Sequence, residues 1–89
     1  MTKYVITVVG RDTVGIIAKV CTFLAEEEVN VLDISQTIVN GYFNMMMIVD
    51  AQKIDSFNEF QDRLLKVGEE IGCIIHCQHE DIFNMMHRI

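Results

Sequence analysis

The sequence predicts one small α+β domain in which an antiparallel sheet is covered on one face by two helices. Three observations carry this prediction. The chain has 89 residues, which is the length of one domain. Its apolar residues alternate along some segments, as in strands, and follow helical spacing along others. An Asn-Gly pair separates two strand-like runs and predicts a hairpin between them.

The first segments read as a strand followed by a helix. Residues 3–9 are mostly β-branched or aromatic and stop at a glycine, a pattern typical of a strand. From Gly15 onward the apolar residues follow helical spacing, and a run of three glutamates closes the segment. We therefore expect a helix over residues 14–27, with Thr13 as its N-cap.

The middle of the chain reads as a hairpin. Residues 31–39 and 42–50 are strand-like, and Asn40-Gly41 between them suits a type I′ turn, in which both central residues have positive φ. Because the helices can cover only one face of the sheet, the other face needs the apolar tail or another subunit as its cover. In the second strand, one face carries Phe43, Met45, Met47 and Val49, and the other carries Tyr42, Met46 and Ile48.

A second helix and a last strand follow. Apolar residues spaced three and four apart predict a helix from Phe57 to Ile71. Ser56 and Glu59 fit a capping box at its start, and Gly72 stands where the helix should stop.

The order of the predicted elements is βαββαβ, because residues 73–79 read as the last strand. Right-handed crossovers then give a four-stranded antiparallel sheet with both helices on one face, the ferredoxin-like arrangement. We expect residues 1–89 to form a single domain of this kind. Residues 80–89 form a short C-terminal extension with a helical pattern.

Composition and charge exclude several kinds of partner and location. The net charge of −6 argues against nucleic acid and against an anionic membrane surface. The three cysteines lack paired spacing, and no segment has the length of a signal peptide or a membrane helix. The sequence therefore predicts a reduced, cytoplasmic protein. Because 51% of the residues are hydrophobic, part of the apolar surface is expected to be buried in a homo-oligomer, a dimer or larger.

The stretch VVGRDTVGII, residues 8–17, leaves the first strand and enters the first helix. Its glycines would let the backbone turn tightly and approach a ligand closely. Free N–H groups at the start of a helix suit a carboxylate, and Asp12 beside them could accept a hydrogen bond from an ammonium group. The loop thus suits the two ends of a free amino acid, although such turns also contain Gly and Asp for their geometry alone.

Nearly the whole chain resembles an ACT domain, the small regulatory module of amino-acid metabolism. The matching features are D-x-x-G-I at residues 12–16, Leu24 near the end of the first helix, and V-N-V at residues 29–31. D-I-S-Q-T at residues 33–37 and the Met-rich hairpin are similar to the stand-alone single-ACT proteins of bacteria and archaea.

The resemblance also implies a ligand site. In amino-acid-binding ACT domains, the first loop and an asparagine at the start of the second strand hold the effector at an interface between domains. Carried over to this chain, the site consists of Asp12, Val14, Gly15 and Asn30. Val14 stands where the family usually has proline, and Glu28 stands where its turn usually has glycine.

The segment CIIHCQH, residues 73–79, has the composition of a metal cluster but the wrong geometry for one four-ligand site. In a strand, His76 would point away from the face that carries both cysteines. Cys73 and Cys77 would lie ~13 Å apart at ~3.3 Å per residue, too far to share one zinc ion. We expect no metal site, with Cys77 and His79 forming a weak one at most.

Motifs of other proteins with this fold are missing from the sequence. Heavy-metal carriers hold their ion on C-x-x-C in the first loop, which here has no cysteine. Acylphosphatases end this loop with a phosphate-binding arginine, where this chain has Ile17-Ala18. The three histidines lack a nucleophile and an orienting acid at recognisable positions. We therefore expect no catalytic residue and no cofactor.

The sequence favours a regulatory module that binds an amino acid or a related metabolite as a homo-oligomer and passes that state to an enzyme or regulator. A protein-interaction module without a small ligand is the first alternative. An acylphosphatase-like hydrolase is the second. The residues do not select one amino acid as the ligand.

Overall fold

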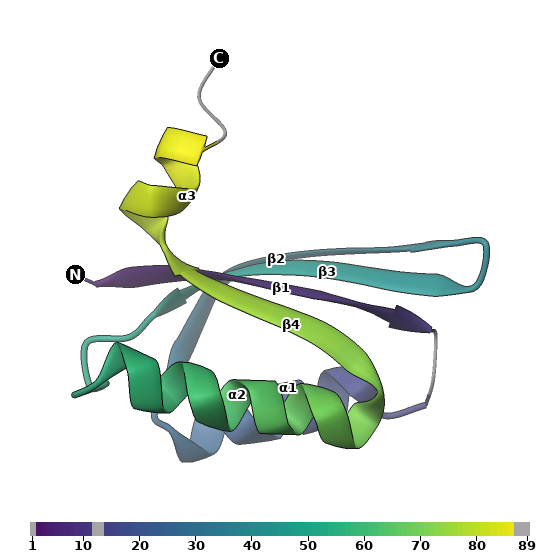
Figure 1. Ribbon diagram of the computed structural model, residues 1–89, viewed down its shortest axis with the longest axis horizontal. Coiled ribbons are helices and arrows are strands. Elements are labelled where there is room, and N and C mark those ends of the chain that lie inside the picture. The colour runs from purple at the N-terminus through teal and green to yellow at the C-terminus, as the bar shows by residue number, and fades with distance from the viewer. Residues whose placement is uncertain (1, 12–13, 87–89) are drawn as a thin grey trace.

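The computed structural model describes residues 2–11 and 14–86. The four strands form one antiparallel sheet in the spatial order β2-β3-β1-β4. Helices α1 and α2 lie on one face of this sheet, and α3 stands on the other (Figure 1). The predicted ferredoxin-like fold is therefore confirmed. The elements are β1 (Lys3–Arg11), α1 (Ile16–Glu26), β2 (Asn30–Val39), β3 (Tyr42–Asp50), α2 (Phe57–Ile71), β4 (Cys73–His79) and α3 (Glu80–Met86).

The β2–β3 hairpin forms as predicted. Asn40 has φ 52° and Gly41 has φ 80°, the positive angles that the turn requires. Pairing runs from Val39 opposite Tyr42 down to Asn30, and one bulge interrupts it between Val31 and Asp33. The ladder therefore places Asn30 at the end of the sheet that lies away from the turn.

Helix α2 begins and ends where its local signals predict. The Ser56 hydroxyl oxygen accepts a hydrogen bond of 3.3 Å from the Glu59 backbone N–H, which is one half of the predicted capping box. Gly72 has φ 72° and donates its N–H to the last carbonyls of the helix. The side of α2 that faces the sheet buries Phe60 and Leu64.

Helix α1 is shorter than the predicted 14–27. It begins at Ile16 and ends at Glu26, and the residue at its N-cap is Gly15. Thr13, the predicted N-cap, lies outside the described residues. Gly15 has φ 90°, a left-handed conformation that cannot continue into a helix, so the first helical residue comes after it.

Strand β1 is longer than predicted, and Gly10 belongs to this strand rather than to the loop. It pairs with Phe43 of β3 on one side and with Cys73 of β4 on the other. A Cβ atom on Gly10 would lie 2.6 Å from the Cys73 sulfur. Glycine is therefore required here by the close approach of β4 and not by a tight turn.

The hydrophobic core fills the space between the sheet and the two helices below it. The two predicted faces of β3 are confirmed, because Tyr42 and Met46 are exposed on the outer face. Among the described helices, none combines the length and the apolar character that crossing a bilayer would require. The core residues from β1, β3 and β4 are Tyr4, Ile6, Val8, Phe43, Met45, Met47, Val49, Ile75 and Cys77.

Candidate functional site

Within residues 2–11 and 14–86, no side chain caps the backbone N–H groups at the start of α1. The first helical hydrogen bond runs from the Lys19 N–H to the Gly15 carbonyl, at 2.9 Å. Apart from its chain neighbours and the backbone of its own helix, no described residue has an atom within 4 Å of the place where a Cβ on Gly15 would stand, so among these residues it is the backbone angle that requires glycine. Val14 beside it is fully exposed. The N–H groups of the first turn can therefore receive a carboxylate.

Asn30 lies at the opposite end of the sheet. It opens β2 at the end where β1 begins with Lys3. The loop toward α1 leaves β1 at its other end, after Arg11. At ~3.3 Å per residue, the length of β1 between these ends is about 26 Å.

Within one chain, the structure therefore brings Val14 and Gly15 together and holds Asn30 apart from them. Asp12, the remaining predicted ligand residue, lies outside the described residues. A site that includes all four residues stays a prediction, and it needs a second chain to bring Asn30 to the start of α1.

Strand β2 forms an open edge of the sheet. Among the described residues, only β3 pairs with it, so the backbone N–H and C=O groups on its outer side have no strand partner. Leu32, Ile34, Ile38 and Val39 are 42% to 60% exposed along this strand. A long unpaired edge with exposed apolar side chains is a template for another strand.

A pocket of about 330 Å³ lies between this edge and the first turns of α1. The sequence does not reveal this pocket, because Ile17 is 19 or more residues away from the strand residues that join it. Gln36 and Thr37 do not stand out as a local signal, because polar residues recur along β2. The pocket is lined by Ile17 from α1, by Gln36, Thr37 and Ile38 from β2, and by Phe43 from β3.

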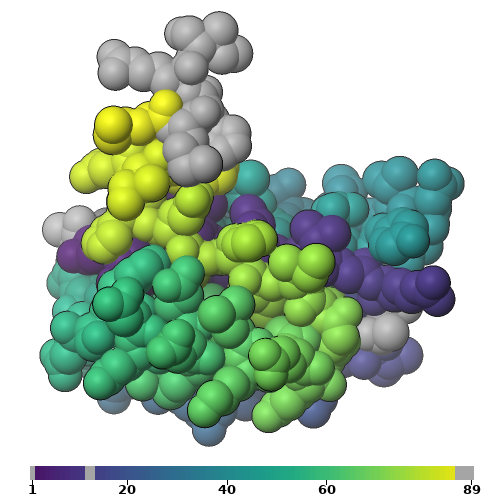
Figure 2. Space-filling view, viewed as in Figure 1, coloured from purple at the N-terminus to yellow at the C-terminus, as the bar shows by residue number. Residues whose placement is uncertain are grey.

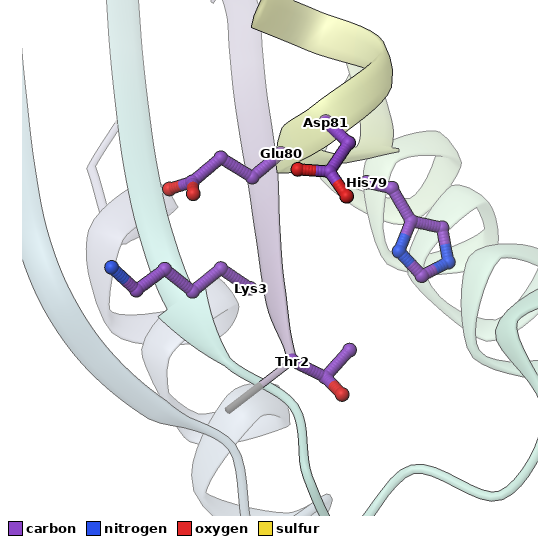
Figure 3. Close-up of a pocket in the computed structure, with 5 residues that line it drawn as sticks. All are labelled: Thr2, Lys3, His79, Glu80 and Asp81. Carbon is purple, nitrogen blue, oxygen red and sulfur yellow. The ribbon is translucent and has the colours of Figure 1, made fainter.

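A second pocket, of about 490 Å³, lies where α3 leaves the sheet, and it has the character of a charged surface hollow. Lys3 and Glu80 extend to one side of β1, whereas His79 lies on the other side (Figure 3). The His79 ring packs against the rings of Tyr4 and Phe57, with centroids 4.9 and 5.2 Å apart. The imidazole therefore belongs to an aromatic cluster and does not converge with the charged groups.

The cysteine and histidine residues of β4 lie as a strand places them. Cys77 points into the core and is 2% exposed, whereas His76 is exposed on the outer face. Burial raises the pKa of the Cys77 thiol to about 12, which disfavours the thiolate that a metal ion binds. Among the described residues, no three His, Cys, Asp or Glu side chains gather as a metal site would require.

Comparison with known proteins identifies close relatives. A family model described as ACT domain matches residues 2–78. A UPF0237 protein of Bifidobacterium longum is 60% identical over 90 residues, covering all of this chain and all of that protein. The match of the relative therefore includes α3, which lies beyond the match of the family model.

Solved structures show the same fold. An ACT domain protein from Streptococcus pneumoniae superposes with a TM-score of 0.84 at 36% identity, covering 92% of this chain and 93% of that one. A formyltetrahydrofolate deformylase from Pseudomonas syringae has a TM-score of 0.81 at 24% identity. This chain covers only 28% of that enzyme, so this likeness concerns the fold alone.

Proposed function

Because the chain belongs to the ACT domain family and is related over its whole length to the small UPF0237 proteins, we propose that it binds a free amino acid, or a related metabolite, between two copies of itself. A regulatory, non-catalytic role of this kind is typical of ACT domains. The observation that carries the proposal is the open edge of β2, which has Asn30 at one end and the Ile17–Gln36 pocket near the other.

Antiparallel pairing of two β2 strands about a two-fold axis would reunite the separated residues. In such a pair, the start of each strand lies beside the end of the other. The partner subunit's Asn30 would then lie beside Val39, close to the pocket and to the first turn of α1. Each dimer would hold two equivalent sites, and each site would draw on both chains.

The polar groups around such a site match the charged ends of an amino acid. The N–H groups near Val14 and Gly15 would donate hydrogen bonds to the carboxylate. Asp12 would accept from the ammonium group, and the amides of Gln36 and the partner's Asn30 offer both donors and acceptors. Charge-assisted hydrogen bonds of this kind are worth roughly 1.5–3 kcal/mol each.

The apolar part of the pocket would receive the side chain of the ligand. Ile17 is 39% exposed and Ile38 is 60% exposed at its rim, and Phe43 is 4% exposed at its floor. An apolar amino acid of moderate size would remove these side chains from water as it binds.

A ligand held between two subunits favours the assembled form by its differential affinity for that form. The dimer with ligand would therefore present one state, and the free subunits another, to an enzyme or regulator in the cytoplasm. This is the regulatory output that we propose.

A thermal-shift screen over the twenty amino acids tests the proposal, with sedimentation velocity as the second readout. We expect one amino acid, or a small group, to raise the melting temperature and the dimer fraction together. Asp12→Ala and Asn30→Ala should each weaken this response about ten-fold or more. Asp62→Ala and Asn58→Ala, on the exposed side of α2, are the matched controls and should respond as wild type does.

A mixing experiment tests whether the site is shared between chains. In a mixed dimer of the Asp12→Ala and Asn30→Ala chains, one of the two sites would contain both intact residues, so binding should return to part of the sites. If both residues acted within one chain, mixing would restore nothing. A dimer that responds to no amino acid would instead favour the interaction module without a ligand.

A further inference from the structure

Helices α1 and α2 leave a groove of about 300 Å³ between them, which we call the α1–α2 groove. Lys19, Thr22 and Glu26 line it from α1, and their spacing of three and four residues places them along one side of that helix. Val67 and Glu70 line it from α2. At ~1.5 Å per residue, the stretch of α1 that lines the groove is ~10.5 Å long, which is about two helical turns.

The floor of the α1–α2 groove is apolar and rests on the core. Phe23 lines the groove and is partly buried, and its ring packs against the ring of Phe60 with the centroids 5.6 Å apart. Phe60 itself is fully buried. Val67 is half-buried on the opposite side of the groove. The floor is therefore held in place by core packing and still exposes apolar surface.

An ion pair joins the two helices beside the groove. Arg63 of α2 donates two hydrogen bonds to the carboxylate of Glu27, the residue that follows Glu26 at the end of α1. Two parallel hydrogen bonds between a guanidinium and a carboxylate restrict the relative orientation of both groups. The helices are thus tied together at this end, and the groove exists before any partner binds.

The rim of the α1–α2 groove carries charges that lack a partner within the described chain. Among residues 2–11 and 14–86, the ion pairs do not involve Lys19, Glu26 or Glu70. Asp62 and Glu69 add exposed acidic groups on α2, and the whole chain has a net charge of −6. The rim and its surroundings therefore attract basic side chains more than acidic ones.

We propose that the α1–α2 groove binds a basic amphipathic helix of a partner protein. The apolar side of that helix would pack on Phe23 and Val67, and its lysine or arginine side chains would lie beside Glu26 and Glu70. A helix laid into the groove between two others packs at the usual interaxial distance of ~8–10 Å. Recognition of an amphipathic helix by an apolar groove with a charged rim is a common mode of peptide binding.

The charges on the page favour this partner over a second copy of the chain and over nucleic acid. A second copy would bring the same acidic helices and the same net charge of −6 to the contact, so the two surfaces would repel one another. Nucleic acid needs a basic surface to neutralise its phosphates, and the rim has two glutamates for its one lysine.

The groove stays accessible when two β2 edges pair. Ile17 lines the pocket beside β2, whereas Lys19 and Thr22 line the α1–α2 groove, so the two lie on different sides of α1. In Figure 2, α2 forms the bottom of the molecule and α3 stands at its top, so α3 does not reach the groove. Because the groove forms within one chain, the inference goes beyond the proposed function and does not depend on it.

Fluorescence anisotropy with a labelled synthetic helix tests the proposal. The probe carries leucine and phenylalanine on one side and lysine on the other, and the control probe has glutamate in place of each lysine. At ~0.15 M salt, we expect saturable binding of the basic probe and no binding of the acidic one. Thr22→Arg should weaken binding about ten-fold or more, because the arginine side chain covers the floor and repels the lysines. Thr22 is exposed, so the fold is retained, and circular dichroism checks this.

Charge reversals separate the groove from a general attraction to an acidic protein. Glu26→Lys and Glu70→Lys alter the rim, and each should weaken binding of the basic probe by about three- to ten-fold. Asp62→Lys and Glu69→Lys are the matched controls. They make the same change of charge at exposed positions on α2 that do not line the groove, and each should weaken binding by less than about two-fold.

Each outcome decides for or against the groove. If wild type does not bind the basic probe, or if the control reversals weaken binding as much as the rim reversals do, the proposal is wrong. If Thr22→Arg lowers the mass of a wild-type assembly in sedimentation velocity, a second copy occupies the groove and the proposal is also wrong. If the rim reversals alone weaken binding while the wild type responds to no amino acid, the groove stands and the ligand site fails.

Discussion

The two helices that cover the sheet are held at their ends by different means. Helix α2 begins with a side-chain cap from Ser56 and ends at Gly72. Helix α1 follows Gly15 at its N-cap, and no side chain in the described part of the chain caps it. The turn after α1 contains Glu28, which has φ 59°, a left-handed angle that favours glycine.

Tertiary contacts hold α1 in place where its local signals are weak. Arg63 of α2 donates two hydrogen bonds, of 2.6 and 3.1 Å, to the carboxylate of Glu27 at the end of α1. The buried residues of α1 are Ile16, Val20 and Leu24, which pack into the core.

The difference between the two helices shows at which helix end backbone N–H groups stay available to bind a ligand. In α2, the Ser56 hydroxyl accepts a hydrogen bond from one of the N-terminal backbone N–H groups, and this helix end has a structural role. At the start of α1, where we propose that a carboxylate binds, none of the residues that the structure describes caps the first N–H groups with its side chain. A helix end that binds a ligand is expected to depart from the usual preference for a side-chain cap.

Among substitutions at the helix ends, Gly15→Val should have the largest effect on stability and on the amino-acid response. Valine at φ 90° should destabilise the fold by about 2 kcal/mol, because the Cβ atom clashes with the backbone in this region. It should also remove the amino-acid response. Urea unfolding and the thermal-shift screen measure the two effects.

Gly72→Val is the matched control for this substitution. Gly72 also has a positive φ and open space around its Cβ position, so the loss of stability should be similar. Its ligand response should remain. An unchanged melting curve and an unchanged response of Gly15→Val would remove Gly15 from the proposed site.

Ser56→Ala should have an intermediate effect. It removes the oxygen that accepts from the Glu59 N–H, and loss of such a cap costs about 1 kcal/mol. Ser56→Asp should retain most of the stability, because aspartate caps equally well. Equal stability of wild type and Ser56→Ala in urea would show that α2 does not depend on its local cap.

Glu28→Gly should have the smallest effect and the opposite sign. Glycine relieves the left-handed strain but makes the unfolded chain more flexible, so we expect a net gain of about 0.5–1 kcal/mol. Glu28 also pairs with Lys53 at 3.2 Å, with both side chains about two-thirds exposed. Lys53→Ala should therefore change the free energy of unfolding by less than about 0.5 kcal/mol. If Glu28→Gly lost stability in urea unfolding, the left-handed backbone angle of Glu28 would not be a source of strain.

Features that depend on neighbouring residues in the sequence were predictable. Asn40-Gly41 specifies its turn through its own backbone angles. Ser56 and Gly72 mark both ends of α2 for the same reason. The alternation in β3 separates its buried face from its exposed face, because successive strand residues point to opposite sides.

The candidate site was less predictable, because its parts are distant in the sequence. The resemblance placed Gly15 and Asn30 in one site, yet the strand directions put them at opposite ends of the sheet. The pocket between Ile17 and Gln36 depends on where α1 crosses below the hairpin. No local pattern encodes that crossing.

By itself, the sequence determined the order of the elements, the hairpin, the ends of α2 and the face that each strand buries, because these follow from local backbone preferences and from periodicity. Only the tertiary structure decided that Gly10 must make room for Cys73, that α3 covers Val5 and leaves Val9 open, and that β2 lies at an edge. These features arise from contacts between segments far apart in the chain. Their geometry is set by packing, which the residue pattern of any single segment does not contain.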